Sequence, residues 1–233
     1  MIKMSVAMNF RTAILILLLT VCTSAEAAIY TSTVNQIIPD NNANGFQNTL
    51  TINNLPSGSI VTDINVTLNI SGGYNGDLYG YLVHDSGFVV LLNHVGSSGS
   101  NPDGYADQGF HITLDDSAGT SVHDYQTVTY TLDASSALTG TWRADGGSLS
   151  SFNGLSANGG WTLFFADTSA GEQSTLQSWS IEVTSVPEPT TCAAIIFGGL
   201  FGMGGCARWV VRKVRQGAAL PSDVPPHGPT RAR

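Results

Sequence analysis

Aspartates are placed along this chain in a way that could bind calcium. Two of them share a glycine-bearing loop with Asn101, two lie beside turns elsewhere, and one follows an alternating apolar run. Calcium prefers several oxygen ligands from carboxylates, amides and backbone carbonyls. The spacing of an EF-hand or an RTX repeat is missing, and aspartates also cap turns and keep surfaces soluble. The candidate calcium ligands are Asp77, Asp103, Asp107, Asp116 and Asp167.

Hydrolytic chemistry finds less support in the sequence. Gly96-Ser97-Ser98-Gly99 lacks the G-x-S-x-G spacing of a nucleophile elbow. The histidines form neither H-E-x-x-H nor H-x-H, which argues against a zinc hydrolase. His111 alternates with apolar neighbours, so we expect it to face solvent. The sequence therefore predicts no catalytic residues and a protein that is not an enzyme.

Aromatic residues raise a third possibility, carbohydrate binding. Tyr79 and Tyr81 alternate with Leu78 and Leu82, so if the leucines are core, both tyrosines lie on an outer sheet face. Sugar rings stack on exposed aromatic rings, which makes Tyr79 and Tyr81 the candidate carbohydrate residues. Trp161 keeps strand phase with apolar neighbours and is expected in the core, as is Trp179.

Short alternating runs must position all of these residues. The clearest run puts Ile60, Ile64, Val66, Leu68 and Ile70 on one face and polar residues on the other, which is typical of a half-buried strand. Glycine, serine and aspartate clusters separate the runs. About eight such strands with few helical signals predict an all-β sandwich. The other expected strands are 48–52, 78–83, 88–92, 110–114, 128–132, 161–165 and 179–183.

Charge and cysteine content limit which partners the central part of the chain, called the body here, can have. Residues 28–189 hold 15 acidic residues and one base, Arg143, which gives a formal charge of 1 − 15 = −14. Such a surface repels nucleic acid and anionic lipid. Cys22, Cys192 and Cys206 all lie outside it, in apolar end segments, so no disulfide is expected in the body.

Both ends carry targeting features. Lys3 and Arg11 precede a short apolar run, and Ala25-Glu26-Ala27 supplies an A-x-A site, a combination typical of a secretory signal peptide. Near the other end, Pro187-Glu188-Pro189 precedes a glycine-rich apolar span and then a basic cluster, which fits a transmembrane segment with its C-terminus inside. The basic cluster consists of Arg208, Arg212, Lys213 and Arg215.

The C-terminal arrangement resembles the PEP-CTERM sorting signal of Gram-negative bacteria. Proline–glutamate–proline, the glycine-rich span and the basic cluster occur in that family's order over about Val186–Arg215. The resemblance implies recognition by an exosortase, a membrane transpeptidase-like enzyme, and a link to extracellular polysaccharide. Family members usually end soon after the basic cluster, whereas here residues 216–233 continue as a tail rich in proline and small residues, expected to be disordered.

The body resembles a second family, the P domain (Homo B domain) of subtilisin-like proprotein convertases. The resemblance rests on an ordered set of short motifs: Ile38-Pro39-Asp40-Asn41, Ile60–Ser71, Gly76-Asp77-Leu78, Gly140-Thr141-Trp142, Phe152-Asn153-Gly154, Asn158–Leu163, Asp167 and Leu176–Trp179. It implies a jelly-roll sandwich. In convertases this domain follows a protease domain and is thought to stabilise it; here only a signal peptide precedes it. Asp77 and Asp167 fall at motif positions, so the fold could bring them together, although Asp77 could instead accept backbone N–H groups in its turn.

Together these features predict an exported, cell-surface or matrix-associated structural or interaction module that an exosortase-type system sorts. Two alternatives stay open: an accessory P domain that acts with a separate extracellular serine protease, and a carbohydrate-binding module of exopolysaccharide. Calcium is the possible cofactor, and the C-terminal helix is the membrane contact. The expected division is a signal peptide at 1–27, the sandwich at 28–185, the sorting signal at 186–215 with its span at 190–211, and the tail at 216–233.

Overall fold

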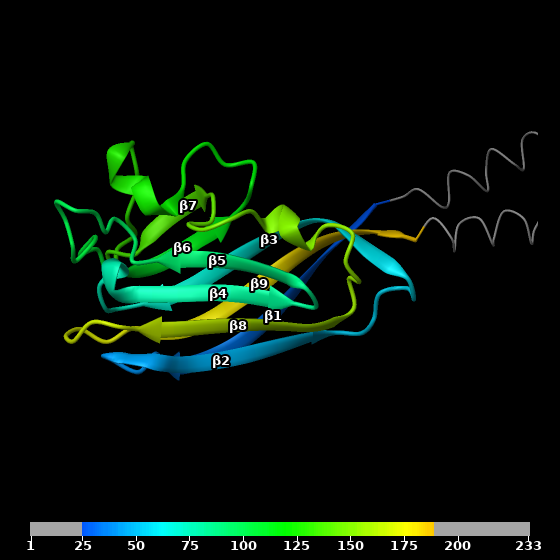
Figure 1. Ribbon diagram of the computed structural model, residues 1–233, viewed down its shortest axis with the longest axis horizontal. Coiled ribbons are helices and arrows are strands. Elements are labelled where there is room, and N and C mark those ends of the chain that lie inside the picture. Colours follow the sequence, from blue (N-terminus) through cyan, green and yellow to red (C-terminus); the bar gives the residue numbers. More distant parts are fainter. Residues whose placement is uncertain (1–24, 189–233) are drawn as a thin grey trace, which may run out of the picture. The chain divides into compact units, whose positions relative to one another are not determined.

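The computed structural model describes residues 25–188, and these fold into nine strands and three short 3₁₀ helices (Figure 1). In chain order they are β1 (Glu26–Ile37), β2 (Asn42–Ile52), β3 (Ser59–Ser71), η1 (Asn75–Asp77), β4 (Leu78–His84), β5 (Gly87–Asn93), β6 (Gly109–Leu114), η2 (Val122–Thr127), β7 (Leu138–Trp142), η3 (Leu149–Phe152), β8 (Gly159–Asp167) and β9 (Thr175–Pro187).

The strands form two sheets that pack face to face. One has the order β1-β9-β3-β6-β7 and the other β2-β8-β4-β5, and all neighbours pair antiparallel except β6 and β7. Buried side chains from both sheets, such as Leu68 and Leu163, belong to one hydrophobic core. The predicted all-β sandwich is therefore confirmed, and its jelly-roll connectivity stays a prediction.

Strand β3 shows how the sequence pattern produces this architecture. Val66, Leu68 and Ile70 are buried and Thr67 between them is exposed, because successive side chains of a strand point to opposite faces. The prediction for Ile60 is wrong in phase. A bulge in the pairing with β9 lies between Val61 and Asp63, so Val61 is buried and Ile60 only half-buried.

One expected strand is absent from the described residues. Residues 128–132 alternate as a strand should, but they follow η2 as irregular backbone, and Val128, Tyr130 and Leu132 are substantially exposed. They lie beside β7, an edge strand of its sheet, but contact it only through an isolated antiparallel bridge from Leu132 to Leu138 and bonds such as Thr139 N–H to the Thr131 carbonyl, 3.0 Å. Alternation alone therefore did not produce a strand where no core covers the apolar side chains.

The sequence analysis did not predict two of the strands. β1 is an edge strand whose outward residues are exposed, and β7 is only five residues long and contains Gly140. Neither has the apolar alternation that marks a half-buried strand. The other seven predicted strands are present, with ends that run up to several residues further than predicted.

The tryptophans behave as their strand phase predicts. Trp161 on β8 and Trp179 on β9 are fully buried between the sheets. The Trp179 indole donates to Asn48 Oδ1 at 2.8 Å, which satisfies its N–H inside the core. Trp179 thus links the five-stranded sheet to β2 of the four-stranded sheet.

The targeting segments lie almost wholly outside the described residues. These include the signal peptide apart from its last three residues, the 190–211 span with its basic cluster, and the 216–233 tail. At the boundaries, Glu26 and Ala27 already pair with Ser185 and Thr184, and β9 continues to Pro187. Among residues 25–188, no helix is both long and apolar enough to cross a bilayer.

Candidate functional site

Two of the predicted calcium ligands meet at one end of the four-stranded sheet. Asp77 closes η1 immediately before β4, and Asp167 is the last residue of β8. The antiparallel register pairs Leu78 with Asp167, so the start of β4 lies beside the end of β8 (Figure 1). Since Asn42 at the start of β2 is the partner of Asp167 on the other side, the Asp40 loop reaches the same end.

Both central carboxylates are removed from solvent. Asp167 is 0% exposed and Asp77 is 5% exposed, while Asp40 is exposed. Asp167 Oδ1 accepts the Ser169 N–H at 3.3 Å, but Asp167 Oδ2 is buried with no hydrogen-bond partner. The Ser169 hydroxyl is close enough to Asp77 to lower its pKa, and Asp40 Oδ1 accepts the Gly171 N–H at 3.2 Å. The β8–β9 loop therefore contacts all three aspartates, which we call the acid cluster.

The surroundings of the acid cluster disfavour ionisation of its buried carboxyl groups. Burial raises the pKa of Asp167 to about 6, and the nearby charges of Asp77 and Asp40 add to this shift. Burial also raises the pKa of Asp77, an effect that the Ser169 hydroxyl partly offsets. Each raised pKa means that ionising the carboxyl group in the folded protein lowers the free energy of unfolding.

The carboxylates of two other predicted ligands are bonded to different partners. Asp107 accepts the Tyr125 hydroxyl at 2.6 Å and the Gln126 amide at 2.7 Å. Asp116 accepts the Leu149 and Ser150 N–H groups and the Ser148 hydroxyl at the start of η3.

Asp103 borders the acid cluster: its charge is one of the smaller causes that raise the pKa of Asp77, and its backbone lies against Gly76. Its carbonyl oxygen would lie 2.1 Å from a Cβ added at Gly76, so glycine there allows the two loops to touch. Across residues 25–188, no group of three or more His, Cys, Asp or Glu side chains is placed so that it could hold a metal ion. Any cation site at the acid cluster would therefore rest on two carboxylates plus other oxygens.

A His–Asp pair tests the possibility of catalysis. His123 Nδ1 lies 3.0 Å from Asp145 Oδ2, as in a catalytic triad, but His123 Nε2 lies 3.0 Å from the Ser97 backbone carbonyl. A carbonyl only accepts, so the position of a nucleophilic hydroxyl is taken. Ser97 Oγ itself bonds the Pro102 carbonyl at 3.1 Å. The His123 side chain thus links η2 to the segments that contain Asp145 and Ser97.

The protonation state of His123 follows from the same geometry. Both ring nitrogens face acceptors, so both can donate only when the ring is an imidazolium. Burial alone would lower the pKa of His123, but the hydrogen bond and the charge of Asp145, with the Ser97 carbonyl, outweigh burial and raise it. Asp145 is itself nearly buried and also accepts the Asn93 N–H at 2.8 Å.

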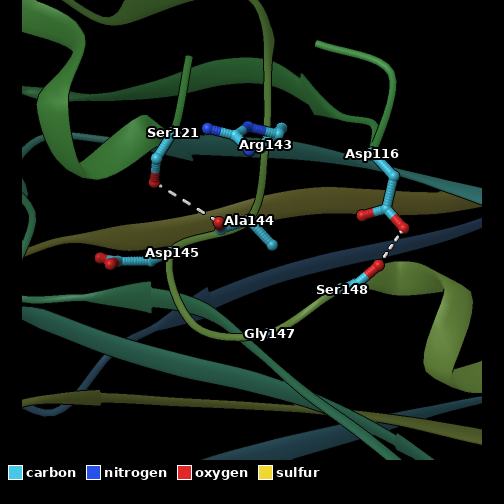
Figure 2. A pocket seen from close by; sticks show the side chains of 7 residues that line it. All are labelled: Asp116, Ser121, Arg143, Ala144, Asp145, Gly147 and Ser148. Carbon is cyan, nitrogen blue, oxygen red and sulfur yellow. Dashed lines mark hydrogen bonds between the residues drawn. The ribbon is translucent and has the colours of Figure 1, made fainter. Parts of the chain in front are cut away.

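A shallow pocket of about 280 Å³ lies beside this pair (Figure 2). Arg143 and Asp116 line it, and the Asp145 side chain points away from the space between them. Ser148 bonds Asp116, and Ser121 Oγ lies 3.4 Å from the Ala144 carbonyl. The hydroxyls in the pocket are thus bonded to a carboxylate and a backbone carbonyl, and neither is bonded to a histidine.

The two candidate carbohydrate residues face outward as predicted. Along β4, Leu78 and Leu82 are buried while Tyr79 and Tyr81 are half-buried. Tyr81 stacks on Phe164 with centroids 4.7 Å apart and also contacts Phe88, which is 50% exposed. Because neighbouring rings cover the Tyr81 face, less of it is available to a sugar than the alternation alone suggests.

Sequence reasoning missed Asp40 as a member of the acid cluster and missed the His123–Asp145 pair. Asp40 had a signal, since it lies in the Ile38–Asn41 motif of the family resemblance. His123 and Asp145 are 22 residues apart and neither belongs to a motif of the resemblance, so no local signal marked them. Of the sorting motif, Pro187 ends β9 and the Glu188 N–H donates to the Gly58 carbonyl at 2.8 Å; Pro189 lies outside the described residues.

Comparison with known proteins gives a family match and several similar solved structures, including two of an Aeromonas serine protease. Residues 61–183 match the proprotein convertase P-domain. A crystal structure of the Aeromonas sobria serine protease with its chaperone is 17% identical and has a TM-score of 0.44, covering 71% of this chain and 28% of that chain. The same protease alone gives 17% identity and a TM-score of 0.42, covering 69% and 27%. This chain thus spans little more than a quarter of those chains, and no curated protein matches it.

Proposed function

Because the chain belongs to the proprotein convertase P-domain family, we propose that it is a non-catalytic structural or interaction module, exported and retained at the cell surface or in the extracellular matrix. The observation that carries the proposal is the environment of the histidines. In residues 25–188 no histidine nitrogen bonds a serine or threonine hydroxyl: His123 contacts Asp145 and a carbonyl, and both ring nitrogens of His84 lie against the carbonyls of Gly160 and Ser156.

The proposed location depends on the two ends of the chain. The signal-peptide pattern favours export, and the PEP-CTERM-like order of Pro187-Glu188-Pro189, apolar span and basic cluster favours sorting by an exosortase-type enzyme. The C-terminal helix would hold the chain in the membrane until processing. The acidic body, with its jelly-roll sandwich outside, fits extracellular partners such as polysaccharide and disfavours nucleic acid.

The test has two readouts on the full-length chain. Purified protein should show no turnover of peptide substrates above blank, and Ser97→Ala should leave this background unchanged. In a host with an exosortase, we expect the mature protein at the surface or in the matrix, and we expect replacement of Pro187-Glu188-Pro189 by alanines to retain it in the membrane. Turnover that a single serine or histidine substitution abolishes would overturn the non-catalytic assignment.

Family membership favours a second candidate, an accessory P domain that acts in trans with an extracellular serine protease. This candidate predicts that the chain raises the thermal stability of a protease secreted by the same cell. Mixing the two proteins and measuring the midpoint of protease inactivation separates the candidates, because a matrix module leaves that midpoint unchanged.

A further inference from the structure

One carboxylate oxygen in the acid cluster has no partner to balance its charge. Asp167 is fully buried, its Oδ1 has a single hydrogen bond, and its Oδ2 has none. Buried polar atoms in native proteins are almost always hydrogen-bonded, and an unpaired buried carboxylate is among the most costly exceptions. The unpartnered oxygen belongs to the residue that the start of β4 and the start of β2 approach from both sides.

We propose that Asp77 and Asp167 hold a calcium ion at this end of the four-stranded sheet, with Asp40 at its solvent side. This inference stands independently of the proposed function. The two buried carboxylates would supply the charged ligands, and Asp40, which is exposed, would add negative charge where the ion enters. Backbone carbonyls, hydroxyls and water would complete the oxygen shell that calcium requires.

No cationic side chain in the described residues balances the acid cluster. Arg143 is the only lysine or arginine within residues 25–188, and it lines the separate pocket beside Asp116 (Figure 2). The charge of His94 lowers the pKa of Asp77 only as one of the smaller contributions. Three carboxylates with one neighbouring imidazole leave an excess of negative charge that a divalent cation would neutralise.

The ligand chemistry favours calcium over the common alternatives. Zinc prefers nitrogen and sulfur ligands, but His94 Nδ1 contacts the Gly76 carbonyl and the described residues contain no cysteine. Magnesium demands a small, regular octahedron, whereas strand-end carboxylates and loop oxygens suit the longer and more variable bonds of calcium. Two carboxylates with weak preorganisation predict an affinity of about 0.1–1 mM, the range typical of extracellular modules.

A shared proton is the competing explanation for the paired aspartates. Without a cation, Asp167 could carry a proton and donate Oδ2–H to a neighbouring oxygen, as one of two close carboxylates often does. The two explanations predict opposite responses to calcium at neutral pH. A proton-sharing pair would be indifferent to millimolar calcium, whereas a calcium site would gain stability from it.

The test is isothermal titration of calcium into the full-length chain in detergent at about pH 7.5, with thermal unfolding in about 10 mM calcium or in chelator. We expect measurable binding and a rise in the unfolding midpoint of about 4 °C, with a smaller rise in magnesium. Asp167→Asn should remove most of this rise. Glu172→Gln, which removes one exposed charge from the same loop, is the matched control and should keep it.

Two outcomes would overturn the site: no heat and no midpoint shift with calcium at pH 7.5, or equal shifts in Asp167→Asn and Glu172→Gln. If Asp167→Asn does not fold, Asp77→Asn takes its place. The pH comparison needs no variant at all. Calcium should stabilise the wild-type chain much less at pH 5 than at pH 7.5, because protons then compete for Asp167, and equal shifts at both pH values would contradict the proposal.

Discussion

Two groups of aspartates in this sandwich have the same chemistry and opposite surroundings. Asp116 and Asp145 lie between loops that offer N–H and hydroxyl donors, and each accepts at least two hydrogen bonds. Asp77 and Asp167 lie at the end of a sheet, where one oxygen of Asp167 finds no donor. Hydrogen bonds outweigh the cost of burial at Asp116, whose pKa is lowered, and offset it only in part at Asp145, whose pKa burial still raises.

The difference comes from where backbone donors are free. The first residues of a helical turn have N–H groups without intrahelical partners, and Asp116 accepts two of them at η3. The N–H groups of β4 and β8 are used in the sheet ladder, so Asp167 has only the Ser169 N–H of the following loop. Surroundings of the second kind favour a cation in place of hydrogen-bond donors.

The largest expected effect comes from breaking the His123–Asp145 pair. Asp145→Ala removes the hydrogen-bond partner of the half-buried His123 ring and leaves the Asn93 N–H without its acceptor. We expect a loss of about 3 kcal/mol in the free energy of unfolding, measured by urea denaturation. Asp124→Ala removes an exposed neighbouring charge and should cost well under 1 kcal/mol, about the usual surface effect. Equal losses in both variants would contradict the assigned role of the pair.

The next largest effect concerns Asp116 and η3. Asp116→Ala removes the acceptor for the Leu149 and Ser150 N–H groups, and loss of such a cap costs about 2 kcal/mol at most. Asp116→Asn keeps one acceptor oxygen and should lose about half as much. The pKa of Asp116 is lowered in the fold, since hydrogen bonds from Ser148, Leu149 and Ser150 outweigh burial. Its stabilisation is therefore present above the unfolded pKa and lost as the pH falls through the folded value.

Substitution in the acid cluster should have the opposite sign. In chelator at pH 7, Asp167→Asn should raise the free energy of unfolding by about 1–2 kcal/mol, because it removes an ionised carboxylate whose pKa is raised to about 6. The folded state binds the proton more tightly, so the wild-type penalty is full above about pH 6 and disappears as the pH falls towards the unfolded value. The gain from Asp167→Asn should therefore shrink at pH 4.5. A destabilised variant at pH 7 would show that Asp167 is satisfied in a way that its geometry does not reveal.

The smallest effect is the titration of His123. Its raised folded pKa means that its contribution is fully present below the unfolded pKa and is lost as the pH rises through the folded value, which lies above the usual 6.5. NMR titration of the ring should give this higher pKa. Asp145→Asn should bring it down, since the carboxylate is the main group that raises it. An unchanged pKa in that variant would mean that the carboxylate does not hold the charge.

Sequence patterns predicted the sheet better than they predicted the acid cluster. Period-two alternation found β3, β6 and β8 because burial of one face imposes that period wherever a strand packs on a core. The same rule failed at residues 128–132, where alternation is present but no core covers it, and at β7, whose pairing depends on β6 rather than on its own residues. Strand existence is local information, whereas strand pairing is not.

By itself, the sequence determined the strand pattern, the acidic surface and the residue types that could hold calcium. Tertiary structure decided which aspartates meet. Antiparallel register sets Leu78 opposite Asp167 and so brings Asp77 close to Asp167, which is 90 positions further along the chain, while Asp107 and Asp116 are bonded to other loops. The same register leaves Asp167 without a second donor. Composition fixes how much charge a chain carries, but only long-range pairing fixes which charges find partners, because donors and acceptors on distant segments meet only in the folded chain.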